Sequence, residues 1–333
     1  MARNKRKKIK DREHMKAVRK DAKRRWRNKK AQEKALKNAA ALKPAGLINV
    51  QKAKDDHLDI NQARERKKEK PALPKKRDES SVIKEIDPVE IVRSEKSIGC
   101  GTFGVCYLAY YRSILVAVKE FRMNSNKSRS DVKRDLLREA RMVNHLGDHR
   151  NLPLLFGAVI KGEQLMLITQ FHGQKGKSVT LSMAIKKKKL EKSEWIEITK
   201  GLCEGLSHVH TRQILHNDLK SNNVVVEKRN DMWNPVIIDF GKSRFISDPK
   251  PRMALTASSQ TSYKKRYPHI APEIVAGSGR QSIQSDIFSL GRIVLSILDL
   301  LPTATAMSLR IAKRAILDNP AKRPSIEEII AVL

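Results

Sequence analysis

The sequence contains little cysteine and no long apolar run. Only Cys100, Cys106 and Cys203 occur in 333 residues, an odd number without regular spacing. This argues against a secreted disulfide framework and against a zinc site. No stretch approaches the roughly 18 apolar residues of a membrane span, and no apolar segment follows the basic first residues as in a secretory signal. We therefore expect an intracellular protein of the cytoplasm, the nucleus or both, with no membrane span.

Acidic residues are scarce relative to basic ones. The formal net charge is +33, and residues 1–80 carry 29 Lys+Arg against 11 Asp+Glu, a surplus of 18. Residues 81–333 carry 40 against 25, a surplus of 15. A surplus of this size favours anionic partners such as nucleic acid, acidic lipid or acidic protein.

Residues 1–80 form a basic, low-complexity arm. Trp26 is its single aromatic residue, and Pro71 and Pro74 indicate a linker near its end. Few large apolar residues are available to anchor a fold, so we expect the arm to be disordered or partly helical. The alternative is that it contacts nucleic acid or an acidic partner, or carries a nuclear-import signal.

A glycine-rich segment follows the point near Val82 where the composition changes. Residues 97–105 read S-I-G-C-G-T-F-G-V, and the residues after Gly104 are strand-like. A dinucleotide-binding turn would need a helix there, so we interpret the segment as a hairpin between two strands. Its glycines let the backbone approach the oxygens of a triphosphate, because no Cβ atoms stand in the way.

Lys119 ends the next strand-like run, residues 114–119. Side chains alternate along a strand, so Ala117 and Lys119 share a face, which suits a flat base beside a phosphate. The helix predicted over residues 130–146, with Ser130 or Asp131 as its N-cap, places Glu139 inside its apolar arc. A buried carboxylate needs a partner, and Lys119 is the candidate. The alternative is that Glu139 reaches water at the edge of the arc.

Residues 214–241 place polar side chains between short apolar runs. Strands are predicted at 224–226 and 236–238, joined by a turn over 228–234, which returns Asp239 to the neighbourhood of Asn223. An acid and an amide at one strand end suit Mg²⁺. Asp218 is then left to accept a proton from a substrate hydroxyl. The alternative is that these residues only form turns.

The strings H-N-D-L-K-S-N-N at 216–223 and D-F-G at 239–241 resemble the catalytic and metal-binding loops of the eukaryotic protein kinases. The resemblance continues in order through a hinge-like T-Q-F-H at 169–172, P-H-I-A-P-E at 268–273, S-D-I-F-S-L-G at 285–291 and N-P-A-K-R-P at 319–324. It covers about residues 88–333. It implies an α+β, two-lobed protein-kinase fold, with a small β-rich N-lobe over 88–170 and a larger α-helical C-lobe over 174–333, preceded by the basic arm.

The resemblance also implies roles for individual residues, with ATP and Mg²⁺ as cofactors. Asp218 would orient and deprotonate the acceptor hydroxyl, and Lys220 would steady the γ-phosphate. Lys119, held by Glu139, would grip the α and β phosphates, and Asn223 and Asp239 would hold Mg²⁺. The implied ATP-contacting residues are Ile98, Gly99, Cys100, Gly101, Thr102, Phe103, Gly104, Val105, Ala117, Lys119, Thr169, Gln170, His172 and Val225. The implied internal spine consists of His216, Phe240, Val143 and Leu155, and Arg323 would pair with Glu273.

Two positions and one spacing depart from the family pattern. Asn217 stands where many kinases have an arginine that meets an activation-segment phosphate. Arg266 stands where Ser/Thr kinases usually place a threonine that contacts Asp218 and Lys220. Asp286 and Arg323 are only 37 positions apart, which implies an abridged C-lobe.

The resemblance implies a protein kinase that transfers the γ-phosphate of ATP to a protein hydroxyl. Lys220, two residues after Asp218, favours Ser/Thr acceptors over tyrosine. Two alternatives remain open at this stage. One is a kinase-fold scaffold that binds nucleotide without transferring phosphate, and the other is a nucleic-acid or nuclear binding protein that acts through residues 1–80.

Overall fold

The computed structural model describes residues 83–333 except 102–103, 124–126, 188–189, 249–254 and 303. The basic arm predicted over residues 1–80 lies outside these described residues. Among the helices that are described, none combines the length and apolar character needed to cross a bilayer.

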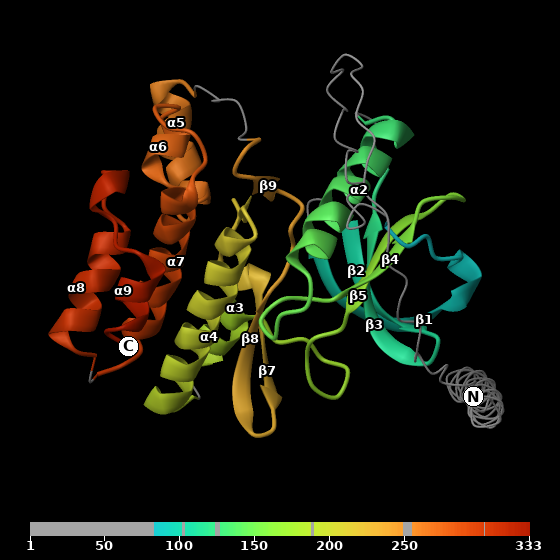
Figure 1. Cartoon of the computed structure of the whole chain (residues 1–333), viewed down its shortest axis with the longest axis horizontal. Helices are drawn as coiled ribbons and strands as arrows, with labels where there is room; N and C mark the ends of the chain where they lie inside the picture. The colour runs from blue at the N-terminus through green and yellow to red at the C-terminus, as the bar shows by residue number, and fades with distance from the viewer. Residues whose placement is uncertain (1–82, 102–103, 124–126, 188–189, 249–254, 303) are drawn as a thin grey trace, which may run out of the picture. The chain divides into compact units, whose positions relative to one another are not determined.

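A five-stranded antiparallel sheet forms the first half of the described chain (Figure 1). Its spatial order is β1-β2-β3-β5-β4. The strands are β1 (Ile91–Gly101), β2 (Gly104–Tyr111), β3 (Ile114–Phe121), β4 (Leu155–Val159) and β5 (Leu165–Gln170), and the short 3-10 helix η2 (Pro88–Glu90) precedes them. Glu85 forms a β-bridge with Ala158 and Ile86 is buried, so packing begins ahead of residue 88.

The alternation of side chains in β5 divides the apolar residues between the two faces of this sheet. Met166 and Ile168 pack in one cluster, whereas Leu165 and Leu167 pack in another with Leu136 of helix α2 (Arg129–Leu146). The helix therefore covers one face of the sheet, as its contacts with β4 and β5 show (Figure 1). The predicted apolar arc of this helix is confirmed, and Glu139 is buried within it.

The start of α2 differs from the prediction. Its N-cap is Ser128, whose hydroxyl accepts a hydrogen bond from the Asp131 N–H, and the Asp131 carboxylate accepts one from the Ser128 N–H. The prediction of Ser130 or Asp131 as the cap was therefore wrong. Asp131 is the third residue of the helix and completes a reciprocal capping box, which the sequence also permits.

Helices dominate the second half, together with short strands. The helices are α3 (Leu181–Lys187), α4 (Lys192–Thr211), α5 (Ala257–Arg266), α6 (Pro272–Val275), α7 (Ile283–Leu298), α8 (Ala306–Ala315) and α9 (Ile326–Ile330), with the 3-10 turns η3 (Ser221–Asn223) and η4 (Pro320–Lys322). The strands are β6 (Ile214–Leu215), β7 (Val224–Arg229), β8 (Met232–Ile237) and β9 (Arg244–Phe245).

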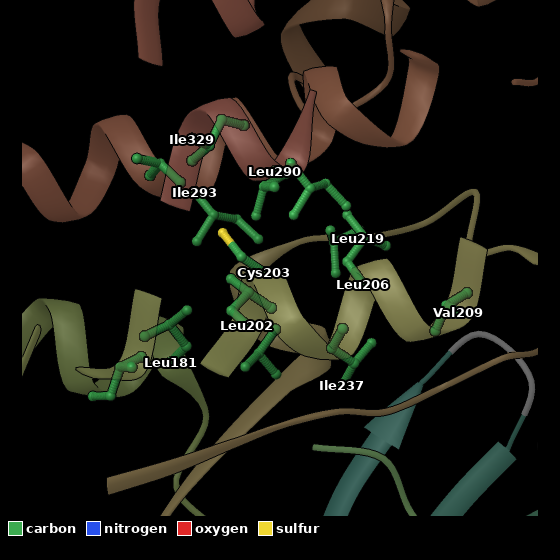
Figure 2. Packing of buried hydrophobic residues seen from close by; sticks show 14 of the residues in the cluster. Leu181, Leu202, Cys203, Leu206, Val209, Leu219, Ile237, Leu290, Ile293 and Ile329 are labelled. Carbon is green, nitrogen blue, oxygen red and sulfur yellow. The ribbon is translucent and has the colours of Figure 1, made fainter. Parts of the chain in front are cut away.

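Helix α4 lies at the centre of the main hydrophobic cluster. Figure 2 shows Leu202, Cys203 and Leu206 of this helix between Ile293 of α7 and Ile237 of β8. Cys203 is fully buried, and burial raises the pKa of its thiol to about 12. This cluster supports the loop that leaves α4 and carries Asp218.

Two local structures differ from the sequence interpretation. The β7–β8 hairpin turns at Asn230 and Asp231, both with positive φ, so its strands are longer and its turn tighter than the predicted turn over 228–234. The polar stretch before Pro268 contains helix α5, capped by the Thr256 side chain. Because α5 has little apolar periodicity, the sequence carries no clear signal for it.

Candidate active site

A cavity lies between the sheet and the β7–β8 hairpin, and most of the predicted nucleotide-contacting residues line it. Those residues are Ile98, Gly99, Gly104, Ala117, Lys119, Thr169, Gln170, His172 and Val225. Asn223 and Asp239 line the same cavity. Cys100 and Gly101 belong to β1, and Thr102 and Phe103 lie outside the described residues.

Val105 is the predicted contact that the structure places elsewhere. In the β2–β3 pairing Cys106 lies opposite Lys119, whereas Val105 lies opposite Glu120. Paired residues share a face of the sheet, so Cys106 is on the face of Lys119 and Val105 is on the other. Cys106 lines the cavity and replaces Val105 as the candidate contact. Counting the strand alternation back from Lys119 across the hairpin would have found it.

The ammonium group of Lys119 is held between two carboxylates. Its Nζ lies 2.7 and 2.8 Å from the two carboxylate oxygens of Glu139 and 2.8 Å from Oδ1 of Asp239. Burial disfavours the charge of Lys119, but the carboxylates of Glu139 and Asp239 outweigh it and raise the lysine pKa above its ordinary value. The predicted pairing of Lys119 with Glu139 is confirmed, and Glu139 is only 3% exposed.

The side-chain amide of Asn223 points its nitrogen toward Asp218. Its Nδ2 donates to the backbone carbonyl of Asp218 at 2.9 Å and lies 3.4 Å from Oδ2 of Asp218. That orientation leaves the amide oxygen of Asn223 able to bind a metal ion, and the Asp239 carboxylate offers a second oxygen in the same cavity. Two hard oxygen ligands with room for water fit Mg²⁺. The pKa of Asp239 is lowered, because the attraction of Lys119 outweighs burial, so a charged carboxylate is available.

Four donors surround the carboxylate of Asp218. His269 Nε2 lies 2.9 Å and Lys242 Nζ lies 3.2 Å from Oδ1, and Lys220 Nζ lies 2.9 Å from Oδ2, beside the longer Asn223 contact. Burial opposes ionisation of Asp218, but the hydrogen bonds from His269 and Lys220 outweigh it and hold its pKa well below its ordinary value. The sequence reading included Lys220 but not Lys242 or His269.

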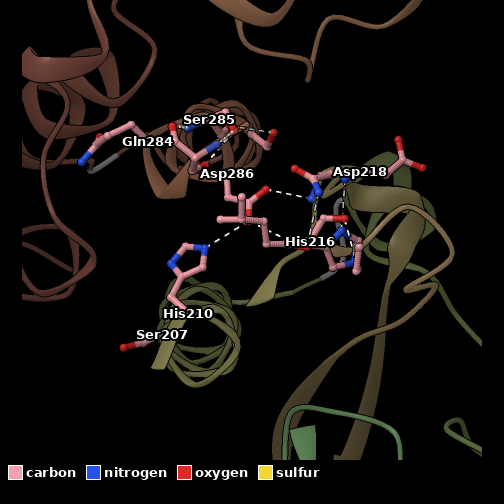
Figure 3. Close-up of polar contacts among 12 residues, drawn as sticks. Ser207, His210, His216, Asp218, Gln284, Ser285 and Asp286 are labelled. Carbon is pink, nitrogen blue, oxygen red and sulfur yellow. Dashed lines mark hydrogen bonds and ion pairs between the residues drawn. The ribbon is translucent and has the colours of Figure 1, made fainter. Parts of the chain in front are cut away.

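Asp286 of α7 anchors the loop that carries Asp218. Its carboxylate accepts hydrogen bonds from the backbone N–H groups of His216 and Asn217, at 2.8 and 2.9 Å, and lies 3.1 Å from the ring of His210 (Figure 3). The residue is only 1% exposed. Asn217 has a φ of 64°, so this anchor fixes an unusual backbone turn one residue before Asp218.

One contact of the predicted internal spine is direct, and its other two members belong to or pack against the same hydrophobic cluster. The rings of His216 and Phe240 lie 5.0 Å apart between centroids. Phe240 and Val143 belong to the main hydrophobic cluster, and Leu155 packs against it. The cluster therefore includes residues of α2 and β4 together with Phe240, whose ring contacts His216 two residues before Asp218.

Glu227 of β7 fixes the segment that follows β5. Its Oε2 accepts a hydrogen bond from the Gly173 N–H at 2.8 Å, and its Oε1 lies 3.1 Å from Nδ1 of His172. Arg229 Nε lies 2.7 Å from the same Oε1. Gly173 has a φ of 147°, and a Cβ there would meet the Lys177 carbonyl oxygen at 2.3 Å, so glycine is required.

Arg323 pairs with Glu273, as the resemblance implied. The two guanidinium NH groups lie 2.8 and 2.7 Å from the two carboxylate oxygens of Glu273. Arg266 does not approach Asp218. It ends α5 exposed, with its guanidinium 5.4 Å from the ring centroid of Tyr267.

The family model of the protein kinase domain matches residues 92–316. That span covers more than half of the chain. The chain belongs to the protein kinase family. The match includes the cavity, the Lys119–Glu139 pair and the loop around Asp218, so the family assignment and the site geometry agree.

Curated relatives of this kinase include receptor-like kinases of Arabidopsis thaliana. It is 31% identical over 204 residues to the G-type lectin S-receptor-like serine/threonine-protein kinase SD1-13, covering 60% of this chain and 23% of that protein. It is 28% identical over 279 residues to cysteine-rich receptor-like protein kinase 27, covering 71% of this chain and 41% of that protein. The chain thus spans well under two thirds of the length of the relatives it matches.

Proposed function

We propose that this kinase transfers the γ-phosphoryl group of ATP to a hydroxyl group of a protein substrate. The observation that carries the proposal is the convergence of Lys119, paired with Glu139, with Asn223 and Asp239 in one cavity. Asp218 stands at the edge of this arrangement, hydrogen-bonded to Asn223. The reaction asks the protein mainly for positioning and for compensation of negative charge, and these residues are suited to both.

The residues divide the work as follows. Lys119 binds phosphate oxygens of ATP, and Asn223 and Asp239 hold Mg²⁺, which supplies positive charge to the phosphates. Asp218 orients the acceptor hydroxyl and takes its proton as the oxygen bonds to the γ-phosphorus and the bond from that phosphorus to the β–γ bridging oxygen breaks. Lys220, already 2.9 Å from Asp218, is close enough to contact the transferred group on the same side.

Serine and threonine are the acceptors we favour. Lys220 follows Asp218 by two residues, as in Ser/Thr kinases, and the relative SD1-13 carries serine/threonine-protein kinase in its name. The scarcity of cysteine and the excess of basic residues support a site of action in the cytoplasm or nucleus. Binding of nucleic acid by residues 1–80 stays a prediction, which filter binding across a salt series would test.

The test is transfer of labelled phosphate from MgATP to a degenerate set of protein-like peptides by the purified full chain. Asp218→Asn should lower the rate about 10²–10⁴-fold, the usual contribution of a base. Asp231→Asn is the matched control, because it makes the same chemical change in the β7–β8 turn and asparagine also adopts positive φ. Equal transfer by wild type and Asp218→Asn would refute the assignment.

One observation favours a nucleotide-binding scaffold as the second candidate. Both oxygens of Asp218 already have donors nearby, from Lys220, Lys242, His269 and Asn223. A carboxylate this well satisfied is a weak base. A rise in melting temperature with MgATP but no phosphate transfer to any peptide would support the scaffold.

A further inference from the structure

His269 contacts Asp218 from the segment between α5 and α6. Its Nε2 lies 2.9 Å from Oδ1 of Asp218, and its side chain is 11% exposed. The two residues are 51 positions apart, so the contact depends on the fold and on no local motif. Nε2 donates this bond in the charged ring and in the neutral tautomer that carries its proton on Nε2, and the carboxylate of Asp218, which only accepts, favours that tautomer.

Helix α7 holds both partners of this contact. Ser289 donates its hydroxyl to the backbone carbonyl of His269 at 2.7 Å. Asp286, three residues earlier on the same helix, accepts the backbone N–H groups of His216 and Asn217 just before Asp218. Residues three apart in a helix lie on one face. One face of α7 therefore sets the position of the carboxylate and of the imidazole together.

The lysines at Asp218 are less constrained than His269. The side chains of Lys220 and Lys242 are 32% and 43% exposed, and each has four rotatable bonds. Such ammonium groups are free to follow phosphate oxygens during a reaction. The histidine ring has two rotatable bonds and is buried, so it is the better fixed of the donors on Oδ1. Arg266, the residue in the position where the family pattern has a threonine, points to Tyr267 instead.

We propose that His269 is a positioning residue for phosphoryl transfer. By holding Oδ1 of Asp218, it directs Oδ2 toward the side of Lys220 and Asn223, where the substrate hydroxyl gives up its proton. This rests on the proposed function, because the effect is expressed through the rate of transfer. In the family pattern the residue at position 266 contacts the base. Here Arg266 points to Tyr267, and His269 donates to Asp218 in its place.

Two substitutions separate a donor from a packing role. His269→Phe keeps a flat ring of similar size beside Tyr267, whose ring centroid lies 6.3 Å from that of His269, but removes the donor. His269→Gln removes the ring but keeps an N–H at about the same reach. The expected result is a kcat lowered about 10- to 100-fold in His269→Phe, the worth of one hydrogen bond to a charged group. His269→Gln should stay within about threefold of wild type in kcat, and KM for MgATP should change little in both variants.

A packing role gives the opposite order, with His269→Phe as active as wild type and His269→Gln impaired, and that order overturns the proposal. Equal kcat in all three proteins overturns it as well. His208→Phe is the matched control, because it makes the same change on α4, where the ring contacts the Leu146 carbonyl and not Asp218. If wild type transfers no phosphate under conditions where MgATP raises its melting temperature, the proposed function is refuted, and the role of His269 in transfer is refuted with it.

Discussion

The buried pair of Arg323 and Glu273 provides a strong test of how the C-terminal residues hold the active site. The guanidinium is fully buried, and five hydrogen bonds use its five N–H donors. Two go to the carboxylate of Glu273, and three go to the backbone carbonyls of Leu317, Gln284 and Asp318. Removal of the guanidinium leaves a carboxylate that is 9% exposed without its partner.

Arg323→Ala should therefore lower the free energy of unfolding by about 3–5 kcal/mol, the usual cost of breaking a buried pair from one side. For a domain of this size that corresponds to a melting temperature lowered by roughly 6–20 °C. Arg323→Lys should lie in between, because an ammonium group has three donors and no planar fork to match the carboxylate. Activity should fall together with stability, since Glu273 is the second residue of α6 and lies four residues after His269.

Arg314→Ala is the control for this experiment. Arg314 pairs with Glu328 at 3.1 Å, but both side chains are more than 40% exposed, so the pair should contribute little to the stability of the fold. Urea unfolding followed by circular dichroism measures all three variants. If Arg323→Ala were no less stable than Arg314→Ala, the reasoning from burial and donor count would be refuted.

Three further predictions follow from buried groups near the site. Asp286→Ala should destabilise the fold by about 3–5 kcal/mol and abolish transfer, because it strands two backbone N–H groups; thermal melting checks the first effect, and unchanged melting would contradict it. Cys203, with its pKa of about 12, should resist maleimide at neutral pH while Cys106 reacts and is protected by MgATP, as peptide mass spectrometry can show. Because the pKa of Asp218 is lowered, its contribution to stability is fully present above its unfolded value of about 3.9 and is lost as pH falls below it. Transfer should accordingly show no loss from protonation of Asp218 between pH 5 and 7. The prediction is contradicted if the rate falls as pH is lowered through that range and if Lys220→Met moves the fall to higher pH.

Apart from Glu273 and Arg323, whose pairing the family resemblance implied, the residues that the sequence located correctly lie within about twenty positions of their partners. The pairing of Lys119 with Glu139 followed from two periodicities, the alternation of a strand and the arc of a helix, applied over short stretches. Asp218, Asn223 and Asp239 followed from a hairpin short enough to return the chain to its start. In each case the geometry is fixed within about twenty residues, where local rules are strongest.

The residues that the sequence did not locate depend on long-range contacts or on weak local patterns. His269 and Glu227 each act on a residue more than fifty positions away, and nothing in their immediate neighbours indicates this. Helix α5 consists almost entirely of polar residues, so it has no apolar stripe to reveal it. Cys106 was within reach of local reasoning, because strand alternation, counted across the short β2–β3 hairpin, places it beside Lys119 and places Val105 on the other face.

The hydrogen bond from the Gly173 amide to Glu227 has consequences for the position of the hinge between the sheet and the helical half, and for inhibitor binding. Since a single carboxylate of β7 holds Gly173 and His172, these two residues should stay with the helical half in any rotation of the sheet relative to it. The pivot would then lie before them, in the one or two peptide units after Gln170. An ATP-competitive inhibitor that hydrogen-bonds to the Gly173 amide must first displace Glu227 from it. Compounds that bind only the backbone up to residue 172 should therefore have the higher affinity.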